Sequence, residues 1–115
     1  MKRDMDLVRE ILLKVEATKG FKVGWELEIQ GRDQDEVAEH VLILGDARLL
    51  EVTEPAFQQV FTNRLTWAGH EFLEASRDPE TWNKVMATIR EKGVGMSFDL
   101  VMQLLKELAR QAMQL

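Results

Sequence analysis

The chain has 115 residues, the length of one domain, and its 45% hydrophobic and 30% charged residues are typical of a globular protein with its own core. It contains no cysteine, which excludes disulfides, thiolate metal sites and a cysteine nucleophile. Residues 1–6 lack the apolar segment of a signal peptide, and no apolar run has the length of a membrane span. We therefore expect a cytoplasmic protein.

The net charge of −5 is unevenly distributed. Residues 1–57 carry eight Lys/Arg and thirteen Asp/Glu, whereas residues 58–115 carry seven of each. A dedicated nucleic-acid binder usually has a basic excess, because neutralised phosphates supply much of its affinity. The charge therefore argues against nucleic-acid binding.

The first half of the chain predicts a helix, a strand and a second helix. Apolar residues recur at helical spacing over residues 3–17, and Asp4 is the expected N-cap. Alternating residues predict a strand over 23–29. The second helix is expected over 34–45, with Asp33 as N-cap in a capping-box variant.

A β-hairpin is expected next. The strands are predicted over residues 47–52 and 57–65, with a turn at residues 54–56. The second strand then runs directly into a helix over 67–76, and Thr66 at the junction is its predicted N-cap. Such a passage from strand to helix is typical of the end of a wing in winged-helix domains.

Two further helices complete the chain. Asp78 and Pro79 open the first, and the second is expected over 98–114. We interpret the whole chain as a single winged-helix-like domain, with its core in residues 1–77 and a helical extension in 78–115.

The last helix is rich in apolar residues, so we expect burial on two sides. One side belongs to the domain core. The other side is covered either by the preceding helix or by a second subunit in a homodimer. In the homodimer, the contact residues would be Leu104, Leu108 and Leu115.

Three segments resemble the domain-of-unknown-function 2513 family of small bacterial and prophage-borne proteins. They read KRDMDLVREILLKVE, EHVLILGDARLLE and RLTWAGHEFLEASRDPETWNKV, and the resemblance covers nearly the whole chain. It implies an α+β fold of the winged helix-turn-helix type. The family's activity is unknown, so the resemblance assigns no functional residue.

A winged-helix fold makes residues 34–45 the equivalent of a recognition helix, which reads the major groove of DNA. Three of its six expected outward residues are acidic and none is lysine or arginine: Gln34, Asp35, Glu36, Glu39, His40 and Ile43. Carboxylates next to phosphates repel a duplex. The candidate DNA contacts are Arg32, Gln34, Arg48, Asn63 and Arg64.

Protein binding is the alternative to DNA binding. Glu36 and Glu39 on the acidic helix, or the apolar last helix, would then contact the partner. A basic nucleic-acid-binding protein would suit the acidic helix.

The sequence indicates no catalytic, cofactor or metal site. His40 and His70 form no HExxH motif and have no partner nucleophile, so we interpret them as structural histidines. Trp25, Trp67 and Trp82 occupy apolar positions and are predicted to pack in the core rather than to stack on bases. We expect a non-enzymatic regulatory or adaptor protein, with a DNA-binding regulator and a protein-interaction module as the alternatives.

Overall fold

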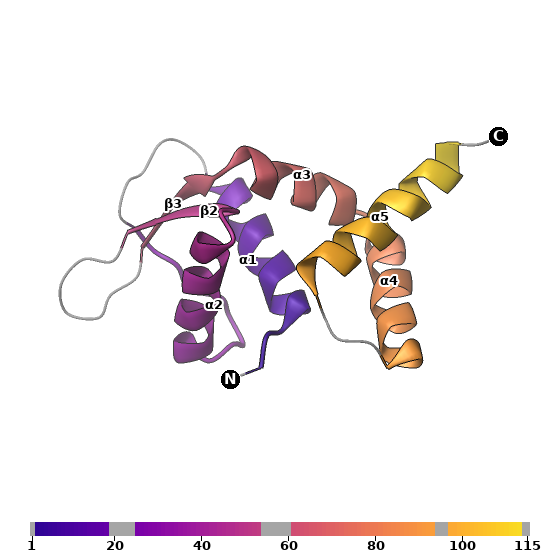
Figure 1. The fold of residues 1–115 in the computed structure, drawn as a ribbon. Coiled ribbons are helices and arrows are strands. Elements are labelled where there is room, and N and C mark those ends of the chain that lie inside the picture. Colours follow the sequence, from indigo (N-terminus) through magenta and orange to yellow (C-terminus); the bar gives the residue numbers. More distant parts are fainter. Residues whose placement is uncertain (1, 19–24, 54–60, 94–96, 114–115) are drawn as a thin grey trace. The chain divides into compact units, whose positions relative to one another are not determined.

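The computed structural model describes residues 2–18, 25–53, 61–93 and 97–113. The chain is an α+β protein in a winged-helix-like arrangement with added C-terminal helices, as the sequence predicts (Figure 1). It divides into two compact units, Met1–His70 and Glu71–Leu115, and each unit is described by itself.

The first unit combines two helices with a small antiparallel sheet. Its strand order is β1-β3-β2, and α1 packs against α2 and β3 while α2 packs against β2 (Figure 1). The elements are α1 (Met5–Ala17), β1 (Trp25–Glu26), α2 (Gln34–Asp46), β2 (Leu50–Thr53), β3 (Phe61–Leu65) and the first turn of α3 (Trp67–Ser76).

Helix α1 follows the predicted pattern. The Asp4 carboxylate accepts a hydrogen bond from the Leu7 amide at 3.2 Å, which confirms Asp4 as the N-cap. The buried residues lie at helical spacing on one face: Met5, Leu7, Val8, Ile11, Leu12 and Val15. Burial of this face against α2 and β3 stabilises the helix more than its intrinsic propensity does.

The strand predicted over 23–29 is shorter in the structure. Within the described residues β1 pairs with β3 at Trp25 and Glu26, and residues 27–33 form neither strand nor helix; residues 23 and 24 of the predicted strand lie outside the described residues. The side-chain amide of Gln34 donates to the Leu27 carbonyl at 3.0 Å, so a side chain occupies this acceptor instead of a neighbouring strand. Between β1 and β2, where every residue is described, α2 is the single helix.

Asp33 is confirmed as the N-cap of α2, but the predicted capping box is wrong. Asp33 holds the N-cap position but its side chain makes no capping hydrogen bond, so the capping box is not formed. Gly45 lies inside the helix, which ends one residue later at Asp46. The chain then reverses through Arg48, whose φ is 62°, and β2 begins at Leu50 rather than at residue 47.

The hairpin pairs β2 with β3 in the expected antiparallel sense. Leu50 lies opposite Leu65 and Thr53 opposite Phe61, with an irregularity in register after Glu51. The predicted turn at 54–56 and the first four residues of the predicted return strand lie outside the described residues.

The junction between β3 and α3 is confirmed. The Thr66 hydroxyl accepts from the Gly69 amide at 3.1 Å and donates to the Arg48 carbonyl at 2.6 Å. The Thr66 amide also donates to the Leu49 carbonyl at 3.0 Å. Thr66 therefore caps α3 and hydrogen-bonds the start of this helix to the backbone just before β2.

The second unit contains the rest of α3, with α4 (Pro79–Lys92) and α5 (Phe98–Met113). The Asp78 carboxylate caps α4 by accepting from the Glu80 amide at 3.3 Å, as expected. Gly93 ends α4 with a φ of 67°, in the left-handed region that glycine adopts without strain.

An aromatic cluster joins the helices of the second unit. The ring of Phe72 on α3 meets Trp82 edge-on at 6.1 Å between centroids and stacks on Phe98 of α5 at 5.2 Å. The apolar residues of α4 form one buried stripe, which includes Trp82 as predicted: Trp82, Val85, Met86 and Ile89.

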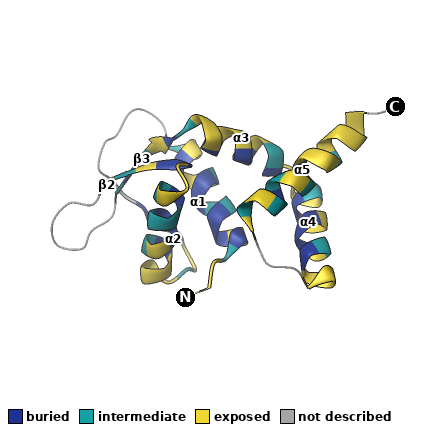
Figure 2. Cartoon of the chain, in the orientation of Figure 1, coloured by how far each residue is buried: buried dark blue, intermediate teal, exposed yellow. Residues whose placement is uncertain are grey.

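Helix α5 is buried on one side only. It packs against α4, which confirms one of the two expected covers, and only Val101 and Leu105 are fully buried (Figure 2). Leu104 and Leu108 are half-buried, and Met113 is 84% exposed. The homodimer, which is the alternative cover, stays a prediction.

Trp67 does not pack in the core, and its prediction is wrong. Its side chain is 79% exposed, because it occupies the first helical position after Thr66, on the side of α3 opposite Phe72. Trp82 is 2% exposed and is a core residue as predicted, whereas the side chain of Trp25 lies outside the described set. No helix in the described residues is long and apolar enough to cross a membrane.

Candidate interaction surfaces

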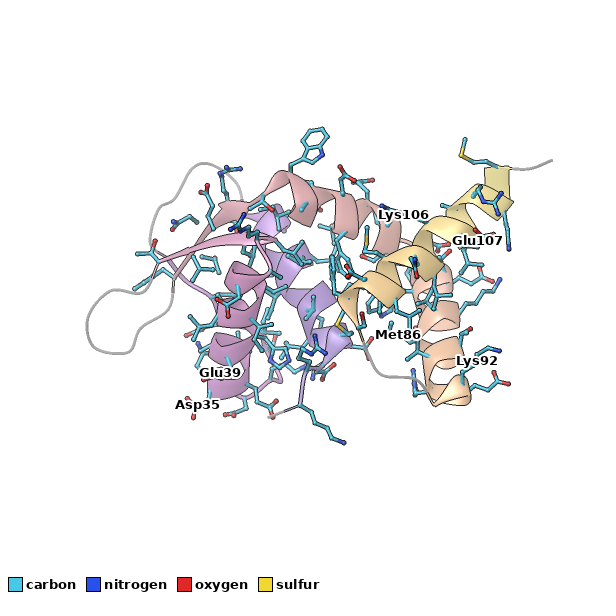
Figure 3. All side chains as sticks on the ribbon, viewed as in Figure 1. Asp35, Glu39, Met86, Lys92, Lys106 and Glu107 are labelled. Carbon is cyan, nitrogen blue, oxygen red and sulfur yellow. The ribbon has the colours of Figure 1, made fainter. Side chains whose placement is uncertain are left out.

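The exposed face of α2 is acidic. Its exposed residues are Gln34, Asp35, Glu36, Glu39 and Asp46, and the helix contains no lysine or arginine. Asp35 and Glu39 point away from the helix near its first turns (Figure 3). The face follows from the burial pattern, since Val37, His40, Val41 and Leu44 form the opposite, buried stripe.

His40 lies on the buried stripe, so its expected outward orientation is wrong. The side chain is 1% exposed, because position 40 follows the buried Val37 by three residues, about one helical turn. Ile43, also expected to point outward, is half-buried.

Both ring nitrogens of His40 are hydrogen-bonded. Nε2 accepts from the Asp4 amide at 2.9 Å, so Nδ1 carries the proton and donates to the Glu36 carbonyl at 2.8 Å. His40 is therefore a structural histidine, as interpreted, that joins α2 to the first turn of α1. His70 is exposed.

Arg32 is held by two carboxylates. Its guanidinium lies 2.9 Å from Asp4 and 3.1 Å from Glu10, and the side chain is only 26% exposed. Burial raises the pKa of Asp4, but hydrogen bonds from the Leu7 amide and from Arg32 outweigh it and lower the pKa overall. The same ion pairs, first that with Glu10, raise the pKa of Arg32.

The remaining DNA candidates fall in two places. Gln34 bonds the Leu27 carbonyl, while Asn63 and Arg64 lie on β3. The Asn63 amide donates to the Thr53 hydroxyl at 3.0 Å, and Arg64 pairs with Glu51 at 2.9 Å.

Arg64 also donates to the Leu65 carbonyl. In the described part of the chain, Arg48 alone of the five candidates is exposed without a hydrogen bond or ion pair of its side chain. The structure therefore does not gather the five into one free basic surface.

The apolar candidates Leu104 and Leu108 line a groove between α4 and α5. Its volume is ≈ 450 Å³, and Val85 and Lys84 of α4 form its other wall. The sequence identified the leucines but not this groove, because its α4 wall is defined only once the two helices are packed. Leu115 lies outside the described residues.

Metal ligands are not clustered in the described residues, where no group of three His, Asp or Glu side chains is placed to hold an ion.

These features define the class as an α+β winged-helix-like protein with an acidic helix face and a helical extension. The profile of the family described as "Hypothetical protein (DUF2513)" matches residues 2–95, and the chain belongs to that family. An uncharacterized protein of Haemophilus influenzae is 31% identical over 115 residues, covering 96% of this chain and 98% of that relative. No solved structure matches the chain significantly.

Proposed function

We propose that this chain is a non-enzymatic adaptor whose α2 face binds a basic surface on a partner protein. The supporting observation is that α2 exposes four carboxylates and contains no lysine or arginine. The four are Asp35, Glu36, Glu39 and Asp46. A basic surface placed against this face would be attracted from a distance and oriented by the charge pattern.

The stability of α2 by itself does not account for these charges. Asp35 and Glu36 suit the positive end of the helix dipole, but Asp46 lies at the negative end, where a base would be favourable. Asp35 and Glu39 are four residues apart, a like-charge spacing that costs a few tenths of a kcal/mol. A basic partner offsets both of these unfavourable terms.

The rival function is a DNA-binding regulator, which the exposed Arg48 beside the hairpin favours. Against it, Arg32 and Arg64 are already paired with carboxylates, and α2 would bring its acids to the phosphates. Each contact between a carboxylate of α2 and a DNA phosphate would be repulsive at moderate salt.

The test is a quantitative pull-down from bacterial lysate with wild type and with Glu36→Lys/Glu39→Lys. We expect the double variant to lose the basic proteins that wild type retains. The matched control is Glu80→Lys/Glu91→Lys, which makes the same charge change at exposed positions of α4. An identical set of partners for wild type and the α2 variant would refute the proposal.

A further inference from the structure

Arg48 has a backbone conformation that suits glycine rather than arginine. Its φ of 62° lies in the left-handed region, where the Cβ of an L-residue comes too close to the following carbonyl oxygen. The end of α2 requires this conformation, because the Arg48 amide donates to the Gly45 carbonyl at 3.0 Å. The Leu49 amide donates to the Leu44 carbonyl at 2.9 Å, which completes a Schellman motif, a helix end whose left-handed residue is usually glycine. Arginine therefore makes this turn less stable than glycine would.

The side chain of Arg48 does not offset this strain. It is exposed, and within the described part of the chain it forms no hydrogen bond or ion pair. A strained backbone that gains no contact inside the chain is typical of a functional position. The strain at Arg48 therefore indicates a role for its guanidinium in binding.

Trp67 lies next to the same turn. The Thr66 hydroxyl donates to the Arg48 carbonyl at 2.6 Å, and the Thr66 amide donates to the Leu49 carbonyl at 3.0 Å, so the start of α3 is held against the turn. The next residue, Trp67, is 79% exposed, although burial of an indole is favourable. Trp67 and Arg48 both belong to the unit Met1–His70. Tryptophan and arginine are also the residue types that most often dominate the binding energy of protein interfaces.

We propose that Arg48 and Trp67 form a binding surface for a segment of a partner protein that carries one carboxylate next to a large apolar side chain. The planar guanidinium of Arg48 pairs with the carboxylate through two parallel hydrogen bonds. The indole of Trp67 packs on the apolar side chain. This ligand has the opposite charge to the one proposed for the acidic face of α2, so the surface is a second binding site.

Charge favours a protein segment over a nucleic-acid strand at this surface. Residues 46–70 contain no lysine and two arginines, and one of these, Arg64, is already paired with Glu51 at 2.9 Å. The one available guanidinium matches one carboxylate. A strand brings a phosphate with every base, and the exposed carboxylates of Asp46 and Glu51 would repel the phosphates that Arg48 does not contact.

The test is a selection from random peptides displayed on beads, with the full chain carrying a fluorescent label. We expect enrichment of peptides with one Asp or Glu next to a large apolar residue. Fluorescence anisotropy then measures the dissociation constant of the selected peptides. Trp67→Ser and Arg48→Gly each raise this constant about tenfold or more.

Stability distinguishes a binding role of Arg48 from a structural one. Arg48→Gly relieves the left-handed strain, so we expect the melting temperature to rise by about 3 °C while the peptide affinity falls. The matched controls are Met113→Ser, at another large exposed apolar side chain, and Lys106→Ala, at another exposed cation. Both controls leave the dissociation constant unchanged.

Three results would overturn this second site: no enrichment of acidic–apolar peptides, an affinity that survives both substitutions, or a lower melting temperature for Arg48→Gly. Binding of oligothymidylate that Trp67→Ser abolishes would also overturn it, in favour of single-stranded nucleic acid. Basic peptides from the same selection report on α2 instead. They keep their affinity for Trp67→Ser and lose it for Glu36→Lys/Glu39→Lys, so the two sites succeed or fail separately.

Discussion

At the residue scale, His40 is a buried connection between two helices. His40→Leu removes the acceptor of the Asp4 amide, and we expect a loss of about 1–2 kcal/mol in the free energy of unfolding, because that amide stays partly buried. Urea unfolding measures the loss. His70→Leu, the same substitution at an exposed position, stays within about 0.5 kcal/mol of wild type. Equal effects at the two positions would contradict the buried role of His40.

Asp4 links stability to pH. Its pKa is lowered in the folded chain below the ordinary 3.8, so its contribution is complete above pH 3.8 and is lost as the pH falls through the lowered pKa. We expect Asp4→Asn to destabilise the protein at neutral pH and to do so less and less as acid is added below pH 3.8. A difference from wild type that is constant down to the lowest pH at which the protein folds would refute this linkage.

Thr62 is the residue where a substitution should increase stability. Its side chain is fully buried, and its hydroxyl finds no hydrogen-bond partner within the described part of the chain. Thr62→Val keeps the shape and removes the unsatisfied hydroxyl, so we expect a gain of about 1 kcal/mol in the free energy of unfolding. A thermal melt at matched protein concentration checks the sign, and a lower melting temperature would show that the hydroxyl has a partner.

Single residues were predictable where one periodicity governed them. The buried stripe of α1 and the cap at Asp4 emerged directly from the sequence pattern. His40 and Trp67 did not, because residue type suggested a polar surface position for one and a core position for the other. Their actual burial depends on which face of each helix packs.

At the element scale, the start of α3 depends on Gly69. A Cβ at this position would collide with the Leu49 carbonyl oxygen, a backbone atom that cannot move away without shifting the start of β2. We expect Gly69→Ala to cost about 2 kcal/mol or more, despite the better helix propensity of alanine.

Gly45→Ala is the matched control, at another helical glycine. A Cβ there would lie 2.9 Å from a methyl group and 3.2 Å from the Cβ of Val52, which are side-chain atoms rather than a backbone carbonyl at closer range. We therefore expect a smaller loss of unfolding free energy than at Gly69. Chemical denaturation of both variants decides the point, and a harmless Gly69→Ala would contradict the close approach of α3 to Leu49.

Elements were predictable where local signals were complete. Thr66 and the pair Asp78-Pro79 gave the starts of α3 and α4 to the residue. The first strand was predicted to continue through residues 27–29, where the structure has none. The alternation of apolar residues does not reveal that the Gln34 side chain donates a hydrogen bond to the Leu27 carbonyl. The sequence likewise did not indicate the positive φ of Arg48, after which β2 begins at Leu50 rather than at residue 47.

At the scale of the whole molecule, the sequence revealed the acidic helix face but not the availability of the basic residues. The sequence named Arg32 and Arg64 as candidate DNA contacts, and only the tertiary structure shows that they are paired with Asp4, Glu10 and Glu51. The sequence did not reveal the groove between α4 and α5 either, because the groove forms only where the two helices pack together. Surfaces of this kind depend on long-range packing that periodicity does not encode.

The central claim is that this winged-helix scaffold presents α2 to a protein and not to DNA. Fluorescence anisotropy against random duplex DNA at low salt tests it most directly, because attraction to phosphates is strongest there. We predict no binding by the purified chain. Binding that falls steeply with salt, and that Arg48→Ala/Arg64→Ala weakens while Arg90→Ala/Lys92→Ala does not, would contradict the account.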